Sequence, residues 1–197
     1  ECKSIETLTI PDGVVSIGDY SFSQSTQLRE INIPDSVASF GRYSFAGCNS
    51  LEKVKIPSRI RSLSYGAFFD CISLKEVILP DGLQTIGGTA FGNCRALAKV
   101  IFPSSLLSIE GNAFTECVSL ESVVLPEGFT TLGSGVFSGC LSLSDIALPS
   151  SLVGIGQNAF QECVSLESIV IPENVSGLGY GAFTGCTSLK NVNIPNK

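Results

Sequence analysis

Histidine is absent from the 197 residues of this sequence. Nucleophilic pairs in which a histidine activates a serine or a cysteine are therefore excluded, as are zinc sites with histidine ligands. Basic residues are also few, with 12 Lys and Arg against 18 Asp and Glu and a net charge of −6. Nucleic acid and anionic lipid both favour a basic surface. The charge balance therefore argues against a nucleic-acid partner and against docking on a membrane surface.

Other signals of chemistry are missing as well. No run of about 18 apolar residues occurs, so no membrane-spanning helix and no direct membrane insertion are expected. The phosphate-binding patterns GxGxxG and GxxxxGK[ST] are absent, and the carboxylates occupy scattered positions without a fixed partner. We therefore expect no catalytic residues, no cofactor and no metal. Hydrophobic residues make up 44% of the chain, which predicts a folded rather than a disordered protein.

What the sequence does contain is a repeat of 23 residues with the consensus P-x-x-V-x-x-I-G-x-x-A-F-x-x-C-x-x-L-x-x-V-x-I. All nine prolines share one phase: Pro11, Pro34, Pro57, Pro80, Pro103, Pro126, Pro149, Pro172 and Pro195. Phenylalanine recurs with the same step from Phe22 to Phe183, and leucine from Leu28 to Leu189. All eight cysteines share a further phase that only Ser25 interrupts. Such regularity is the signature of a stacked repeat protein.

The unit itself predicts a short strand. In the stretch 120–126, LESVVLP, the apolar residues Val123 and Leu125 alternate with period two, which is typical of a strand with one face in the core. Proline has no N–H and ends the strand. The next apolar pair, such as Leu106 and Ile109, fits either a second short strand or one helical turn. Stacked units would bury these side chains, with parallel strands about 4.8 Å apart.

The residues resemble a known family at this point. The stretch 111–133, GNAFTECVSLESVVLPEGFTTLG, is similar to the BspA-like, Treponema-type leucine-rich repeats, and the resemblance extends over essentially the whole chain. It implies a mainly β leucine-rich-repeat solenoid with irregular turns and a parallel β-sheet on its concave face. It also implies an extracellular or cell-surface location, with roles in adhesion and protein recognition. We predict one solenoid domain over residues 1–197, about 8.5 repeats long, that is part of a longer or processed chain.

The cysteines admit three interpretations. An even number of cysteines suggests disulfides in a secreted chain, and four thiolates could hold zinc. A strict 23-residue phase instead stacks the thiols in a row with parallel Cβ vectors, which suits neither a disulfide nor a zinc site. A column of reduced, buried thiols is therefore the favoured interpretation. In addition, the sequon Asn174-Val175-Ser176 follows Pro172, where the chain should face solvent, and it would matter if a eukaryote secretes the protein.

A candidate binding face follows from the strand pattern, because the residues on either side of the central Val or Ile point away from the core. The residue after that position is apolar in five consecutive units: Ile78, Ile101, Val124, Ala147 and Val170. The residue before it is polar in the same units: Glu76, Lys99, Ser122, Asp145 and Ser168. An apolar stripe beside a polar one is typical of a binding face with a polar rim. The alternative interpretation is that these residues occur here only because β-branched side chains favour strands. These ten residues form the predicted partner-binding site.

The predicted function is a non-catalytic recognition module that binds a protein, or a glycan, through the concave sheet. The partner would be a host or matrix protein, or a neighbouring subunit. The alternative is a permanent scaffold subunit of a larger assembly, since open solenoid ends call for a cap or a neighbour. A third hypothesis is a thiol-based redox or metal store. The reactivity of the native thiols distinguishes this hypothesis from the other two, because buried thiols are inert.

Overall fold

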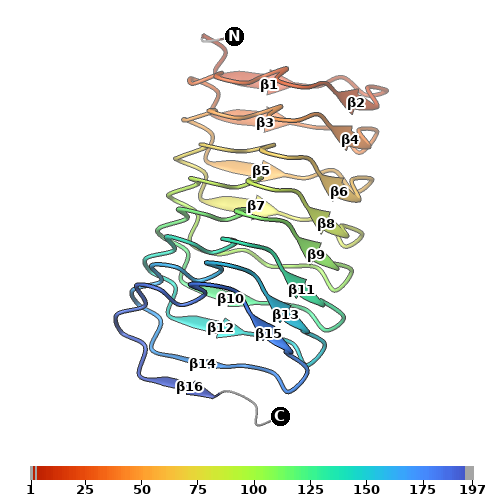
Figure 1. Ribbon diagram of the computed structural model, residues 1–197. Coiled ribbons are helices and arrows are strands. Elements are labelled where there is room, and N and C mark those ends of the chain that lie inside the picture. Colours follow the sequence, from red (N-terminus) through yellow and green to blue (C-terminus); the bar gives the residue numbers. More distant parts are fainter. Residues whose placement is uncertain (1, 3, 194–197) are drawn as a thin grey trace.

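The computed structural model describes residue 2 and residues 4–193, which form an all-β column of stacked turns (Figure 1). No helix occurs in this part of the chain. Each turn of the column takes one 23-residue unit and contributes up to two short strands, and Pro195 lies outside the described residues. The predicted solenoid of parallel strands with irregular turns is confirmed.

The first set of strands is formed by the L-x-x-V-x-I segments, as predicted, and we call the surface that they build the main face. Its strands are β1 (Thr7–Thr9), β3 (Glu30–Asn32), β5 (Lys53–Lys55), β7 (Glu76–Ile78), β10 (Ser122–Val124), β12 (Asp145–Ala147), β14 (Ser168–Val170) and β16 (Asn191–Asn193). Residues 99–101 occupy the same position in the fifth turn, but only Lys99 makes a bridge, to Ser122. Partner residues in paired strands are 23 apart, as in Val54 opposite Val77.

The second set of strands settles the ambiguity of the second apolar pair, which forms a strand of two residues and not a helical turn. These strands build the second face: β2 (Ser16–Ile17), β4 (Ser39–Phe40), β6 (Ser62–Leu63), β8 (Thr85–Ile86), β9 (Ser108–Ile109), β11 (Thr131–Leu132), β13 (Gly154–Ile155) and β15 (Gly177–Leu178). The last six of them form one parallel sheet without a break. The second face therefore ties the C-terminal two thirds of the column together.

A third ladder of hydrogen bonds runs through the turns that carry the phenylalanines. In one such turn the N–H groups of Thr89, Phe91 and Asn93 donate to carbonyls of the next turn at 3.1, 2.8 and 2.7 Å. The residues at the Thr89 and Asn93 positions have a positive φ in every turn from Tyr20 to Gly185. Asparagine and glycine tolerate this conformation, whereas it strains a β-branched residue such as Thr89. The backbone of these turns is thus hydrogen-bonded from one unit to the next.

The core consists of columns of like residues. The phenylalanine rings stack along the axis, with centroids 5.3 Å apart between Phe91 and Phe114 and 5.8 Å apart between Phe114 and Phe137. The leucine column is fully buried from Leu28 to Leu166. Each thiol from Cys48 to Cys186 donates a hydrogen bond to a phenylalanine carbonyl of the preceding turn, as Cys94 does to Phe68 at 3.2 Å. The shared phases of phenylalanine, leucine and cysteine in the sequence thus become three columns of like residues in the core.

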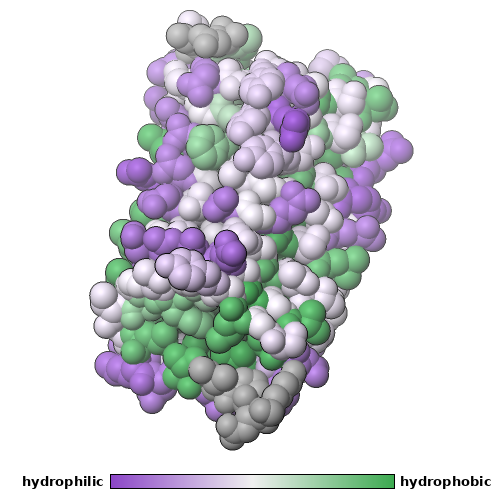
Figure 2. Space-filling view, in the orientation of Figure 1, coloured by the Kyte–Doolittle hydropathy of each residue, from purple (hydrophilic) through white to green (hydrophobic). Residues whose placement is uncertain are grey.

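The column is less closed at its C-terminal end. Phe183, Cys186 and Leu189 continue the core columns but are only partly buried, and Val192 is exposed. In Figure 2 the hydrophobic side chains gather at this lower end of the view, whereas polar side chains are spread over the turns above it. Because each turn is covered by its neighbour, the last described turns leave part of the core open.

Candidate binding face

The main face presents the predicted binding residues in the predicted alternation. The central residues of its strands are buried and both neighbours point outward, as in β7, β12 and β14. All ten predicted residues lie on this face, and all are exposed except Ser122, which is half-buried. Among the large apolar side chains of the stripe, Ile101 is 73% exposed and Val170 is 66% exposed. The structure thus brings the ten residues together on one surface, and their role in binding stays a prediction.

The apolar stripe of the main face has no counterpart on the second face. There the corresponding outward positions hold Val15, Leu107 and Val153, which are 59%, 52% and 45% exposed. These three residues are separated from one another by polar residues in the intervening turns, such as Gln84 and Thr130. β-branched and aliphatic residues therefore occur singly on the second face, as is normal for a protein surface, but follow one another without interruption on the main face.

Charged side chains of the main face pair from one turn to the next. Lys53 contacts Glu76 at 2.9 Å, Lys75 contacts Glu52 at 2.9 Å, and Lys190 contacts Glu167 at 3.4 Å. More than half of each of these side chains is exposed, so such pairs contribute little to stability. Glu76 forms its ion pair with Lys53. Lys99, which lies on the other side of Glu76, makes no ion pair within the described part of the chain.

The main face is built of parallel strands, as predicted, but its strands do not form one continuous sheet. Its strands pair two by two, β1 with β3, β5 with β7, β10 with β12, and β14 with β16. Ile56 N–H donates to the Ile78 carbonyl at 2.9 Å within one such pair. Among the described residues, the equivalent bond from Leu79 to Ile101 is missing. The equivalent bonds from Ile33 and Leu148 are missing from the described chain too, so the main face has a break between β7 and residues 99–101 and similar breaks between β3 and β5 and between β12 and β14.

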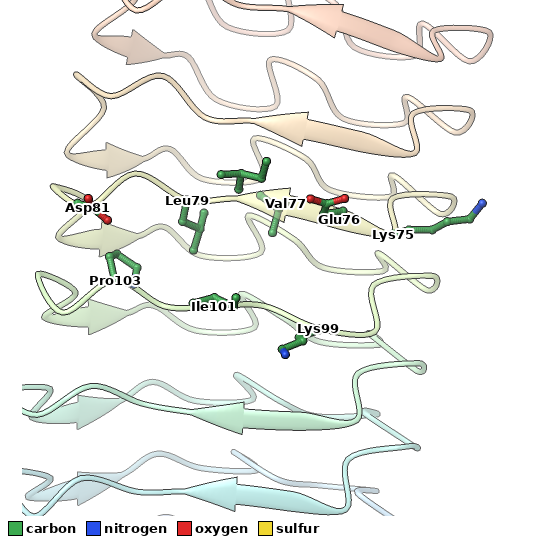
Figure 3. A pocket seen from close by; sticks show the side chains of 9 residues that line it. Lys75, Glu76, Val77, Leu79, Asp81, Lys99, Ile101 and Pro103 are labelled. Atoms are coloured by element: carbon green, nitrogen blue, oxygen red, sulfur yellow. The ribbon is translucent and has the colours of Figure 1, made fainter.

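A cavity of about 410 Å³ lies at this break (Figure 3). Its apolar lining comes from Val77, Ile78, Leu79, Ile101 and Pro103, and its charged lining from Lys75, Glu76, Asp81 and Lys99. Four of the ten predicted residues therefore line it: Glu76, Ile78, Lys99 and Ile101. The central part of the predicted stripe is hollow and mainly apolar.

Phe102 is the residue that sequence reasoning missed at this break. It occupies the position that Ile10, Ile33, Ile56 and Leu79 hold in the preceding turns. Its ring is buried and packs edge-on against Phe114, with centroids 5.6 Å apart. Equivalent breaks follow Ile33 and Leu148 in other turns, so a break does not require this ring. The exchange of an aliphatic residue for phenylalanine in a regular column was the signal in the sequence that marks Phe102.

The thiols occupy surroundings that suppress their reactivity. Burial is the main cause that raises the pKa of Cys117 and Cys163 to about 12, and that raises the pKa of Cys71, Cys94 and Cys140 as well. The thiolate is the form that attacks disulfides and binds metals. No group of three or more potential metal ligands comes together within the described residues. The thiol column is thus a part of the core, and Cys2 is its one exposed member in the described chain.

The raised thiol pKa values predict a loss of stability at alkaline pH. A thiol ionises near pH 8.5 in the unfolded chain, whereas Cys117 resists ionisation up to about 12 in the fold. The folded state therefore binds more protons between these values, so the stability from the neutral thiols is complete below about pH 8.5 and falls as the pH rises toward 12. We expect the urea midpoint to be flat from pH 7 to 8.5 and then to decrease.

The Cys117→Ala variant is the control for this effect. It starts at lower stability because it leaves a small cavity, and its midpoint should fall less steeply between pH 9 and 11 than that of the natural chain. All other titratable groups are common to both proteins, so the difference between the two curves isolates the Cys117 thiol. Parallel curves for the two proteins would contradict a contribution from the buried thiol.

Asn174, the acceptor of the sequon, is exposed as predicted, and its side-chain amide donates to the Ser150 carbonyl at 2.8 Å. The residues that the structure describes also include no helix that could cross a membrane.

Comparison with known proteins places this architecture among the repeat proteins of bacteria. Residues 1–121 and 107–197 match the family described as BspA type leucine rich repeat region. A leucine-rich repeat protein from Bacteroides ovatus is 31% identical, with a TM-score of 0.74, over 96% of this chain and 55% of its own. The T. pallidum leucine rich repeat protein is 30% identical, with a TM-score of 0.75, over 94% of this chain and 78% of its own.

A third solved structure is described as a leucine rich cell surface protein from Faecalibacterium prausnitzii. It is 30% identical, with a TM-score of 0.69, over 95% of this chain and 47% of its own length. The chain thus spans about half the length of the proteins from Bacteroides ovatus and Faecalibacterium prausnitzii. No curated protein matches it.

Proposed function

This chain belongs to the BspA-type leucine-rich-repeat family, and we propose that it is a non-catalytic recognition module that binds a protein partner on its main face. The observation that carries the proposal is the uninterrupted apolar stripe of Ile78, Ile101, Val124, Ala147 and Val170, which is exposed over five consecutive turns. Soluble proteins seldom leave contiguous apolar surface uncovered unless it serves a contact.

The polar stripe beside it supports a protein partner. Glu76, Lys99, Ser122, Asp145 and Ser168 run parallel to the apolar stripe and would form a rim of mixed charge and hydrogen-bonding groups. Protein interfaces have this anatomy, with an apolar centre that excludes water and a polar edge. A glycan ligand would need many polar groups at the centre of the face, where this chain has aliphatic side chains.

A cell-surface location is consistent with the similarity to a leucine rich cell surface protein from Faecalibacterium prausnitzii. On that basis the partner would be a host or matrix protein, or a neighbouring subunit at the cell surface. The acidic net charge of −6 favours neither nucleic acid nor anionic lipid as the ligand.

Three lysines placed in the stripe test the proposal. The variant with Ile78→Lys, Ile101→Lys and Val124→Lys keeps the buried strand residues and adds charge to the exposed ones. We expect it to fold, as seen by circular dichroism, and to lose capture of the partner that the natural chain retains from extracellular matrix and cell extracts. Charges without partners are costly at the centre of an interface, so the loss should be at least about a hundredfold in affinity.

The second face supplies a matched control. The variant with Val15→Lys, Leu107→Lys and Val153→Lys changes three similarly exposed apolar residues by the same charge. It should capture the same partner as the natural chain. Equal capture by both variants would refute the main face as the binding surface. A partner that is retained by the natural chain through prolonged washing and dilution would identify a permanent assembly and not transient recognition.

A further inference from the structure

The cavity at the break between β7 and residues 99–101 has two charged side chains, Asp81 and Lys99, that make no ion pair among the described residues. Two other acidic residues, each directly after a proline, bond to the next turn, Asp35 to the Ser58 N–H at 2.8 Å and Glu127 to the Ser150 N–H at 3.3 Å. Asp81 holds the same position and makes no such bond among the described residues.

Lys99 stands at the other side of the same cavity. Its neighbour in the polar stripe, Glu76, is paired with Lys53 on the preceding turn, so Lys99 is an exposed cation without an ion pair in the described chain. Figure 3 shows Asp81 and Lys99 on opposite sides of the cavity, with Leu79, Pro103 and Ile101 between them. The arrangement is an apolar hollow with a negative charge at one end and a positive charge at the other.

The separation of the two charges suits an extended chain. Lys99 lies in register with Glu76, five residues before Asp81, and a strand rises about 3.3 Å per residue. In an extended ligand, residues i, i+2 and i+4 point to the same side, and they span about 13 Å. Three alternate residues can therefore reach Lys99, the apolar hollow and Asp81 together.

We propose, as a refinement that rests on the proposed function, that this cavity is the anchor point of the partner. It takes one branched or aromatic apolar side chain from an extended protein segment. That segment carries an acidic residue on the Lys99 side and a basic residue on the Asp81 side, each two positions from the apolar one. A buried apolar anchor supplies most of the binding energy in such interfaces, and the two end charges fix the direction of the chain.

Short fluorescent peptides are the probe that tests the anchor. One peptide carries glutamate, leucine and lysine at alternate positions in a serine and threonine background, and a second carries the same residues with the two charges exchanged. A third replaces leucine by alanine. We expect one of the two charge orders to bind about tenfold more tightly than the other by fluorescence anisotropy at low ionic strength, and the alanine peptide to bind at least about tenfold more weakly than the better leucine peptide.

Exchanging the charges on the protein makes the test specific. The variant with Asp81→Lys and Lys99→Glu keeps the net charge, and it should prefer the opposite peptide. The control variant, with Glu167→Lys and Lys190→Glu, exchanges an exposed pair near the C-terminal end and should keep the preference of the natural chain.

The outcomes separate the anchor from the wider proposal. A preference that does not reverse with the exchanged charges, equal binding of the alanine peptide, or no binding of any peptide would each overturn the anchor. The proposed function would survive all three results if the lysine variant of the stripe still lost its natural partner. If the lysine variant of the stripe also kept its natural partner, both the anchor and the proposed function would be overturned.

Discussion

Replacing Phe114 with alanine is expected to lower the free energy of unfolding by about 3–5 kcal/mol. The ring is fully buried, lies between the rings of Phe91 and Phe137, and receives the edge of Phe102. Removing it leaves a cavity that the neighbouring turns cannot fill, because their backbones are fixed by hydrogen bonds such as Phe114 N–H to the Val136 carbonyl at 3.0 Å. Urea unfolding followed by circular dichroism measures the change.

Phe183→Ala provides the comparison for this prediction. Phe183 belongs to the same column and stacks on Phe160 at 5.5 Å, but it is only partly buried near the C-terminal end. Its replacement should cost clearly less, because solvent already reaches the site and the end of the column can relax. Equal losses for the two variants, or an unchanged urea midpoint for Phe114→Ala, would contradict a core that depends on stacked rings.

The second large effect is expected from Gly156→Ala. A Cβ on Gly156 would lie 2.5 Å from the Gly133 carbonyl carbon and 2.6 Å from the Ser134 nitrogen. Both are backbone atoms of the preceding turn, so the two turns would have to separate. The cost should be about 1–3 kcal/mol, as for other overpacked sites, and it should weaken the ladder in which Gly156 N–H donates to the Leu132 carbonyl at 2.9 Å.

Gly154→Ala is the matched control, two residues earlier in the chain, at the start of β13. A Cβ there meets no atom within 4 Å, and the φ of Gly154 lies outside the left-handed region. Alanine should therefore be neutral or stabilise the fold by up to about 1 kcal/mol, because it restricts the unfolded chain. If the two alanine variants unfolded at the same denaturant concentration, close approach of the turns would not be the reason for glycine at position 156.

Much of the fold could be predicted because each column of the repeat corresponds to one physical role. Val54 was expected to face inward because it stands between Lys53 and Lys55, and in the structure it pairs with Val77, which holds the same position in the next unit. The thiol column was predicted from its phase, and its hydrogen bonds to phenylalanine carbonyls give each thiol a fixed direction. The residues that recur in every unit therefore determine the structure that the turns have in common.

The departures from the repeat were harder to interpret. The pattern gave no means to choose between a strand and a helical turn for pairs such as Leu106 and Ile109, because two residues carry too little periodicity. The breaks of the main face recur between turns of similar sequence, so they arise from the way in which neighbouring turns stack. Asp81 and Lys99 come from different turns, so an argument based on one turn at a time could not predict the cavity that both residues line.

Hydrogen exchange of the complex with the captured partner tests the binding face most directly. Among the described residues, the amide of Leu79 beside the break has no partner in the ladder, and it should exchange rapidly in the free chain. We predict that the partner slows exchange in the segments 76–79, 99–102 and 122–125, and leaves the second-face strands β8, β9 and β11 unchanged. Slowed exchange confined to the second face or to the phenylalanine turns would contradict the assignment of the main face as the surface of recognition.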